Sequence, residues 1–376
     1  MEFDHIRIDD SPPCGRLAFC ETADLTGNGL PDIIVGGLGD VKERSVLGKP
    51  IQFRFVPGVG RLIRHREFNV FWYENPGWER HDIVQSPDLG VGAALFDLSG
   101  NGRLDLIAGQ NTGSDLFWFE QPQDPRRTWT PRLITSDFEK YHDLAIGDVD
   151  DDGDPELLGL SQHSEVVFYY DIPSNPYEAP WPKDHRHIID TNLNVEGAAI
   201  RDVDGDGCTE VIAGPNIFHR NADEWSREQI SGDWKWTRVA VGDLTGDGNL
   251  DIVLSEGDRP YHDGIPGRVA TFSAPNWEGT VLADKLQNPH SLQVGDFTGT
   301  GSLDIYVAEM GLGTNDSPAH LLFINDGNGE FDRRTLFEGI ATHEASAVDL
   351  TGDGTLDIVG KSYTPTHHVD AWIRVE

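Results

Sequence analysis

The feature that most constrains the fold is a short pattern that starts with aspartate, continues through small and polar residues, and ends in an apolar stretch. Two of its copies read DLTGDGNLDIVLS and DLTGDGTLDIVGK. Seven copies occur, and they begin at Asp24, Asp97, Asp148, Asp202, Asp243, Asp296 and Asp349. Their starts lie about 40 to 75 residues apart, a repeat length typical of one four-stranded propeller blade. The sequence therefore predicts an all-β fold, a seven-bladed β-propeller that occupies residues 1–376 as a single domain.

Each repeat contains segments for four strands. A short strand such as SLQVGD precedes the loop, an apolar strand such as LDIVLS follows it, and a third and fourth read NVFWYENP and WERHDIV in the first repeat. The last repeat stops after HVDAWIRVE, whereas the chain begins with FDHIRID, a segment that belongs to no repeat of its own. We expect residues 3–9 to complete the seventh blade and close the ring, which removes exposed sheet edges.

The loop of each repeat carries oxygen-bearing side chains at its positions one, three, five and nine. In the third copy these are Asp148, Asp150, Asp152 and Glu156. Such side chains can converge on one ion while glycines permit the tight backbone, and Ca²⁺ prefers flexible, oxygen-rich coordination. An EF-hand is excluded because position twelve never holds its bidentate glutamate and position nine opens a strand. The alternative is an ion-free turn that only shapes the blade.

The candidate Ca²⁺ ligands of the other copies occupy the same positions. They are Asp24, Thr26, Asn28 and Asp32; Asp97, Ser99, Asn101 and Asp105; Asp202, Asp204, Asp206 and Glu210; Asp243, Thr245, Asp247 and Asp251; Asp296, Thr298 and Asp304; and Asp349, Thr351, Asp353 and Asp357.

With these loops the chain resembles the FG-GAP/VCBS repeat propellers, a family that includes the head of integrin α-subunits. The resemblance covers nearly the whole chain and implies several structural Ca²⁺ ions, each in the loop between the first two strands of a blade. We expect strong binding in loops three, four, five and seven. Asn28 and Asn101 predict weaker binding in loops one and two, and Thr298 with Thr300 predicts the weakest binding in loop six.

A second set of residues recurs six positions before the first aspartate of the loop. The residues found there in blades three to seven are His142, Glu196, Thr237, His290 and His343. This position starts the innermost strand, so we expect it at the mouth of the central channel, on the face opposite the aspartate loops. The ends of the following strands are also polar and include Gln162, His163, Glu256 and Lys361. We call this expected polar mouth the funnel.

Imidazoles that converge with the carboxylate of Glu196 are a plausible ligand set for Zn²⁺ or another transition metal. They are equally suited to proton transfer, because histidine titrates near neutrality. A third interpretation is that these polar side chains only bond neighbouring blades or face water. The candidate catalytic residues are His142, His290, His343, Arg238, Tyr141, Tyr363 and Lys361.

Two function classes follow. The first is a carbohydrate-active lyase or dehydratase that eliminates next to a carbonyl or carboxylate: a histidine is the base, Arg238, Lys361 or a metal stabilises the enolate, and Tyr141 or Tyr363 is the acid. The C-terminal half is similar to propellers of the aldos-2-ulose dehydratase and polysaccharide lyase type, in architecture and residue type. The second class is a non-catalytic propeller that binds sugars or proteins. A structural repeat with an unused funnel is a further alternative.

The net charge and the composition limit the classes of partner that this chain is expected to bind. The chain has 64 acidic against 29 basic residues, a formal net charge of −35, which argues against nucleic acid. It contains no apolar run long enough for a membrane helix, and we expect a carbohydrate or another small polar ligand. Three scattered cysteines do not suggest a disulfide framework. No signal peptide is expected in MEFDHIRIDD, which leaves the localisation open. One basic insertion, residues 37–68, is a candidate cover for the funnel.

Overall fold

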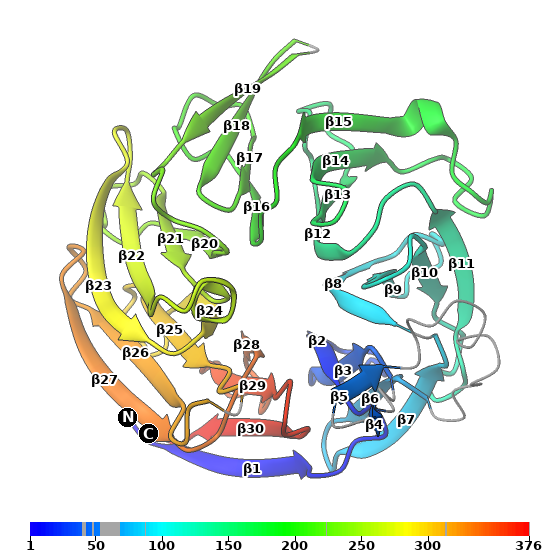
Figure 1. Ribbon diagram of the computed structural model, residues 1–376, viewed down its shortest axis with the longest axis horizontal. Coiled ribbons are helices and arrows are strands. Elements are labelled where there is room, and N and C mark those ends of the chain that lie inside the picture. The colour runs from blue at the N-terminus through cyan, green and yellow to red at the C-terminus, as the bar shows by residue number, and fades with distance from the viewer. Residues whose placement is uncertain are drawn as a thin grey trace.

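The computed structural model describes residues 1–39, 43–46, 49–52, 68–86, 88–222, 224–312 and 314–375. Seven four-stranded antiparallel sheets form a closed ring around a central axis, as Figure 1 shows. The predicted seven-bladed propeller is therefore confirmed. Most of the basic first-blade insertion lies outside the described residues. Within it a two-stranded hairpin of β4 (Glu43–Val46) and β5 (Lys49–Gln52) is described, but whether the insertion covers the funnel stays a prediction.

Each blade uses four strands, ordered from the axis outward. Blade one consists of β2 (Leu17–Ala23), β3 (Asp32–Gly37), β6 (Val70–Glu74) and β7 (Glu79–Val84). Blade two consists of β8 (Leu89–Phe96), β9 (Asp105–Gln110), β10 (Leu116–Glu120) and β11 (Thr130–Thr135). Blade three consists of β12 (Tyr141–Gly147), β13 (Glu156–Ser161), β14 (Val166–Asp171) and β15 (Arg186–Thr191). Blade four consists of β16 (Ala198–Arg201), β17 (Glu210–Ala213), β18 (Asn216–Asn221) and β19 (Glu224–Gln229).

The remaining blades repeat this order. Blade five consists of β20 (Arg238–Gly242), β21 (Asp251–Ser255), β22 (Gly267–Ser273) and β23 (Glu278–Leu286). Blade six consists of β24 (Pro289–Gly295), β25 (Asp304–Glu309), β26 (Ala319–Asn325) and β27 (Phe331–Glu338). Blade seven consists of β28 (Glu344–Val348), β29 (Asp357–Lys361), β30 (Val369–Arg374) and β1 (Phe3–Asp9). A short 3₁₀ helix (Lys183–His185) and a single-turn helix, α1 (Arg259–His262), lie in loops.

The N-terminal strand closes the ring as the sequence predicts. β1 pairs antiparallel with β30, and Phe3 lies opposite Arg374 while Ile6 lies opposite Ala371. The first strand of the chain is thus the outer strand of the last blade, and Figure 1 shows both termini side by side there. We call this pairing of β1 with β30 the seam, and it joins the two ends of the chain through backbone hydrogen bonds.

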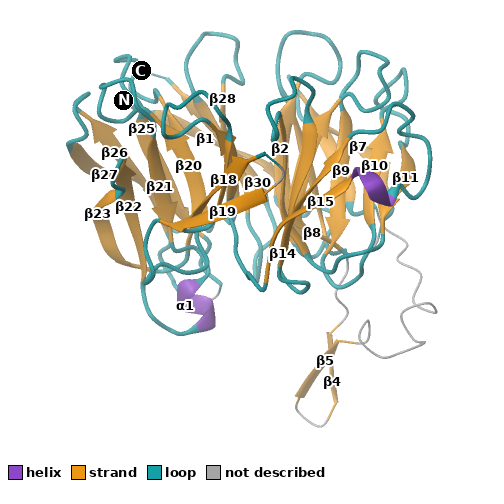
Figure 2. Cartoon of the chain, turned by 90° about the horizontal axis from the view of Figure 1, so that it is seen from above, coloured by secondary structure: helices purple, strands orange, loops and turns teal. Residues whose placement is uncertain are grey.

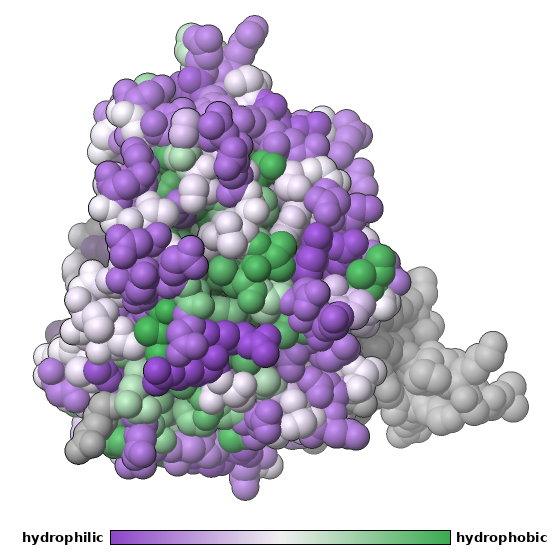
Figure 3. All heavy atoms as spheres, turned by 90° about the vertical axis from the view of Figure 1, so that its left-hand side faces the viewer, coloured by the Kyte–Doolittle hydropathy of each residue, from purple (hydrophilic) through white to green (hydrophobic). Residues whose placement is uncertain are grey.

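The core is divided among the contacts between neighbouring blades. The described residues form seven buried apolar clusters, and each one joins two adjacent sheets. Between blades one and two, for example, Trp72 packs with Phe119, and between blades six and seven Tyr306 packs with Trp372. The second strands of the blades, such as β3, β13 and β25, are buried along their length, which explains why the segments after the loops are almost continuously apolar. Figure 3 shows that one outer side of the ring is mostly hydrophilic, with hydrophobic residues near its middle.

The two faces of the ring carry different loops. The aspartate loops connect the first and second strands of each blade, and α1 follows β21 on the opposite face, the lower side in Figure 2. The starts of the inner strands lie on the same face as α1 because each inner strand runs toward its aspartate loop. Among the described residues, no helix has the length and apolarity needed to cross a membrane.

Candidate metal centre and cavity in the funnel

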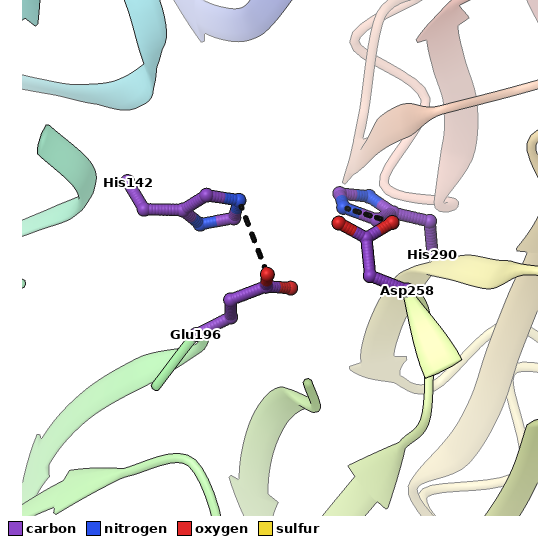
Figure 4. A group of neighbouring side chains, drawn as sticks. All are labelled: His142, Glu196, Asp258 and His290. Atoms are coloured by element: carbon purple, nitrogen blue, oxygen red, sulfur yellow. Dashed lines mark ion pairs between the residues drawn. The ribbon is translucent and has the colours of Figure 1, made fainter. Parts of the chain in front are cut away.

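Four side chains from four consecutive blades converge in the funnel. They are His142 in β12, Glu196 just before β16, Asp258 just after β21 and His290 in β24. One ligand atom of each lies within 4.8 Å of the others, and Figure 4 shows the four side chains pointing toward a common centre. We call this group the His–carboxylate cluster. Three of its members, His142, Glu196 and His290, occupy the position six residues before the loop aspartate that the sequence singled out.

His142 is held by its neighbour on the same strand. Its Nδ1 lies 2.8 Å from Oδ2 of Asp143, which leaves Nε2 turned toward the cluster, 3.8 Å from Oε1 of Glu196. Asp143 is itself fixed by Arg238 at 3.0 Å and by the backbone N–H of Gly197 at 3.0 Å. Burial opposes the charged imidazole, but the carboxylates of Glu196 and Asp143 outweigh it and raise the pKa of His142. A carboxylate behind a histidine is a common way to orient a metal ligand.

His290 offers a free nitrogen to the same centre. Its Nδ1 donates to the backbone carbonyl of His343 at 2.8 Å, so Nε2 carries the lone pair, 4.0 Å from Oδ1 of Asp258. Within the described part of the chain this buried Nε2 has no hydrogen-bond partner. Burial lowers the pKa of His290 to about 3, so the imidazole is neutral near pH 7. A neutral, unpartnered imidazole is the form that binds a transition metal.

Glu196 supplies a fully buried carboxylate, with none of its surface exposed. Its Oε1 accepts a hydrogen bond from Nε2 of Gln162 at 2.6 Å, whereas Oε2 is buried without a partner among the described residues. Burial and the nearby Asp258 raise the pKa of Glu196 to about 7. Two neighbouring carboxylates in such a site carry a charge that a divalent cation would neutralise. The donor set of two imidazoles and two carboxylates fits Zn²⁺ or a similar ion.

A cavity of about 760 Å³ opens beside this cluster. His142 and Asp258 form part of its wall, and His343 and Tyr363 line it from blade seven. The rest of the lining comes from blades one, two, three, five, six and seven: Arg16, Val91, Asn111, Lys140, His163, Pro260, Tyr261, His262, Gln287, Asn288, Met310, Leu312, Thr314 and Thr364. Its volume is typical of a pocket for a small molecule.

The structure distributes the seven predicted catalytic residues over three environments. His142 and His290 belong to the cluster, and His343 and Tyr363 line the cavity. His343 stacks between His290 and Tyr363, with ring centroids 4.0 and 4.5 Å away. The roles of these four residues remain predictions, but their common location agrees with the expected funnel.

The other three predicted catalytic residues do not line the cavity. The hydroxyl of Tyr141 is bonded to the carbonyl of Ser114 at 2.9 Å. Lys361 is fully buried, where it donates to the carbonyl of Leu17 at 3.1 Å and bonds Nδ1 of His343. Tyr141 thus lies in the core between blades two and three, and Lys361 lies between blades seven and one, while their catalytic roles stay predictions.

Arg238 also acts inside the ring instead of at the cavity wall. It binds Asp143 at 3.0 Å and Glu344 of blade seven at 3.4 Å. Glu256, expected at the funnel, pairs with Arg259 and Arg268 instead. The residue that enters the cluster is Asp258, two positions later, which sequence reasoning missed. The only available signal was the run SEGD at the end of the strand.

Two of the aspartate loops gather acidic groups. In loop three Asp148, Asp150 and Glu156 have ligand atoms within 4.8 Å of one another, and Oδ1 of both aspartates is buried without a partner among the described residues. Burial and the three neighbouring aspartates raise the pKa of Glu156 to about 8. In loop four the groups are Asp202 with Asp204 and Asp206, and Asp204 with Glu210 and His219. The participation of His219, from β18, was not expected.

The residue at position nine of each aspartate loop also accepts backbone hydrogen bonds. This second role explains why the other loops do not gather acidic groups in the same way. Where it is aspartate, as at Asp357, one oxygen accepts the N–H of Leu350 at 2.9 Å and the other accepts that of Arg374 at 2.7 Å. In loop three the longer Glu156 uses one oxygen for Val149 at 2.7 Å. Within the described residues no three-carboxylate group forms in loops five and seven, where position three is Thr245 or Thr351, and Ca²⁺ binding there stays a prediction. In loop six Thr298 donates to Asp304 at 2.9 Å, so the loop is closed by its own hydrogen bond.

The comparison with known families agrees with the repeats. The sequence profile of the FG-GAP-like repeat matches residues 97–159, 202–254 and 296–360, which include the aspartate loops of blades two to seven. No curated protein matches the chain. The chain is therefore a seven-bladed β-propeller built from FG-GAP-like repeats.

Proposed function

We propose that the protein is a metal-dependent carbon–oxygen lyase or dehydratase that acts on a carbohydrate in the funnel. The observation that carries this proposal is the His–carboxylate cluster at the wall of the cavity. Nε2 of His290 and Oε2 of Glu196 are buried there without partners in the described structure, beside His142 and Asp258. A bound divalent ion supplies a Lewis acid for a carbonyl or carboxylate oxygen of the substrate.

Elimination breaks a carbon–hydrogen bond next to the carbonyl or carboxylate. The electron pair of that bond forms a carbon–carbon double bond, and the carbon–oxygen bond on the far side breaks as the leaving oxygen takes a proton. His163 and His262 line the cavity outside the cluster, and burial lowers the pKa of each. Both are neutral near pH 7 and can accept the proton from carbon.

His343 is suited to protonate the leaving oxygen, whereas His163 and His262 are suited to accept the proton from carbon. Burial lowers the pKa of Lys361 to about 7, and its Nζ contacts Nδ1 of His343. When Lys361 donates in this contact, the proton of the neutral imidazole is on Nε2. The hydroxyl of Tyr363, whose pKa burial raises, is the second donor at the cavity wall. Either group can protonate the leaving oxygen, so the geometry supports a donor role for His343 in place of the base role that its residue type suggested.

Metal analysis with variants tests this proposal. Protein loaded with Zn²⁺ or Mn²⁺ is expected to hold one ion in the funnel, and His290→Ala is expected to lose it. His187→Ala, a histidine of the outer strand β15, is the matched control. Turnover of a sugar panel is followed by the ultraviolet absorbance of the new conjugated double bond. Full turnover by metal-free protein or by His290→Ala would contradict the proposal.

The alternative function is a propeller that binds a sugar without turning it over. The observation that favours it is Tyr261 at the cavity wall, 67% exposed, which offers an aromatic face for stacking. A ligand that binds tightly and is recovered unchanged from the metal-loaded protein would support this alternative.

We further propose that Ca²⁺ occupies loops three and four and stabilises the native propeller. Loop three offers the strongest support, because Oδ1 of Asp148 and of Asp150 is buried beside Glu156 without a partner in the described chain. Ca²⁺ that binds only the folded state raises its stability. A thermal unfolding midpoint that does not change after thorough chelation would contradict this assignment.

A further inference from the structure

The charge of the cavity wall differs in sign from the charge of the protein. The chain carries a formal net charge of −35, yet the cavity lining contains two cations, Arg16 and Lys140, and Asp258 as its carboxylate among the described residues. Asp258 also belongs to the His–carboxylate cluster, where a bound cation would neutralise it. A cleft whose walls share one sign of charge concentrates ligands of the opposite sign.

Both cations are available to a ligand. Arg16 lies directly before β2, and its guanidinium is 5.2 Å from the ring centroid of Tyr363. Lys140 lies directly before β12 in a left-handed conformation, φ 58°, and its carbonyl accepts the N–H of Gln162 at 3.0 Å. Within the described chain neither side chain has a carboxylate partner within 4.0 Å. Arginines of the outer strands do have such partners, namely Arg80, Arg132, Arg186 and Arg227.

Arg16 and Lys140 reach the cavity from positions directly before their inner strands, and Lys140 lies two residues before His142 of the cluster. Arg16 and Lys140 come from blades one and three and flank Asn111 of blade two. The cluster comes from blades three to six. A ligand in the cavity can therefore direct an anionic group toward Arg16 and Lys140 while its hydroxyl groups face the polar side chains of Asn288 and Thr314. Tyr261 offers a face for the sugar ring.

We propose that the substrate is a carboxylated sugar whose carboxylate is recognised by Arg16 and Lys140. This inference rests on the proposed elimination, which itself favours a carboxylate because that group acidifies the neighbouring carbon–hydrogen bond. A sulfate ester is an anion too, but it does not acidify that bond through an enolate. The carboxylate is therefore the anion that agrees with both the charge of the wall and the chemistry.

Binding of matched oligosaccharides tests the assignment. The probes are uronate-containing oligosaccharides, their carboxyl-reduced counterparts, and a sulfated oligosaccharide without carboxylates, each titrated calorimetrically into the metal-loaded full chain. We expect the uronate probes to bind tightest, and Arg16→Gln and Lys140→Gln each to weaken them by about tenfold, because each removes a charge-assisted hydrogen bond. Lys285→Gln and Arg333→Gln, at exposed cations of outer strands, are the matched controls.

The outcomes separate this inference from the proposed function. Equal affinity for the uronate and reduced probes, equal or tighter binding of the sulfated probe, or absence of binding by the folded, metal-loaded chain overturns the inference. An unchanged affinity in both Arg16→Gln and Lys140→Gln overturns it as well. Selective uronate binding that depends on these cations, without turnover or without a funnel metal, supports the inference while the lyase proposal fails.

Discussion

Arg238 shows how single residues of the inner strands hold the funnel together. From blade five it reaches Asp143 of blade three at 3.0 Å and Glu344 of blade seven at 3.4 Å. Asp143 in turn orients His142 through Nδ1. Burial raises the pKa of Glu344, while the Arg238 guanidinium acts in the opposite direction. One side chain therefore connects three blades and supports a predicted metal ligand.

We expect Arg238→Met to destabilise the protein by about 3 kcal/mol, because two largely buried carboxylates lose their counter-ion. The free energy of unfolding is measured in urea, with the exposed Arg333→Met as the control. Metal affinity is expected to fall about tenfold or more in the same variant, because Asp143 no longer holds His142 in one orientation. Unchanged stability together with unchanged affinity would show that the bridge has neither role.

The carboxyl of Glu21 in β2 is expected to make the stability of the protein depend on pH. Burial and the nearby Glu344 raise its pKa to about 8, above the value of 4.5 for an unperturbed glutamate. Between these two pH values the native state retains a proton that the unfolded state releases. The contribution of Glu21 to the free energy of unfolding is therefore complete below pH 4.5 and is lost as pH rises through 8. We expect Glu21→Gln to raise the thermal midpoint at pH 8 and to change it little at pH 4.

The comparison of midpoints at the two pH values decides this prediction. Glu79→Gln, an exposed glutamate at the start of β7, is the control for loss of a surface charge. If Glu21→Gln shifts the midpoint equally at pH 4 and pH 8, the carboxyl of Glu21 does not titrate as argued.

At the scale of elements, the two ends of each inner strand have different roles, one at the aspartate loop and one at the funnel. The loop end bonds the backbone through position nine, and the opposite end presents His142, His290 or Glu196 to the funnel. The placement of these three side chains in the funnel could be predicted because they share one register of a repeated strand. Asp258 could not, because it lies in the irregular connection that contains α1, which no other repeat reproduces.

The aspartate loops allow a test within one molecule. We expect Asp150→Asn in loop three to abolish most of the Ca²⁺-dependent rise of the thermal midpoint, because it removes one of three converging carboxylates. Asp353→Asn in loop seven is the matched control, since Asp353 is bonded to Thr355 of its own loop. Calcium titrations are followed by differential scanning calorimetry. Equal losses in the two variants would show that both loops bind Ca²⁺, as the sequence predicted.

The whole molecule depends on a seam between its two ends. β1 completes the sheet of blade seven, and Tyr73 of blade one donates its hydroxyl hydrogen to Asp9 at 2.7 Å across the neighbouring interface. His5 and Arg7 both approach the buried carboxylate of Asp370 at 2.6 Å. Loss of this strand would expose the edge of β30 and leave Asp370 with fewer partners, so ring closure couples the terminal strand to the stability of all blades.

We expect deletion of residues 1–9 to lower the thermal midpoint by several degrees and to promote association through the exposed edge of β30. Deletion of residues 1–2, which precede β1, is the control. The midpoint is measured by circular dichroism and the association by light scattering. A truncated chain that is as stable and as monomeric as the control would show that the seam is dispensable.

The sequence by itself determined the number of blades, the order of strands, the closure by residues 3–9 and three of the four members of the His–carboxylate cluster. These follow from local patterns, because a repeated strand and loop specify the same backbone at every copy. Only the tertiary structure decided that Asp258 joins His142, Glu196 and His290, and that Tyr141 and Lys361 turn away from the cavity. Those outcomes depend on distances across the ring, where residues from different blades meet, and no local pattern encodes them.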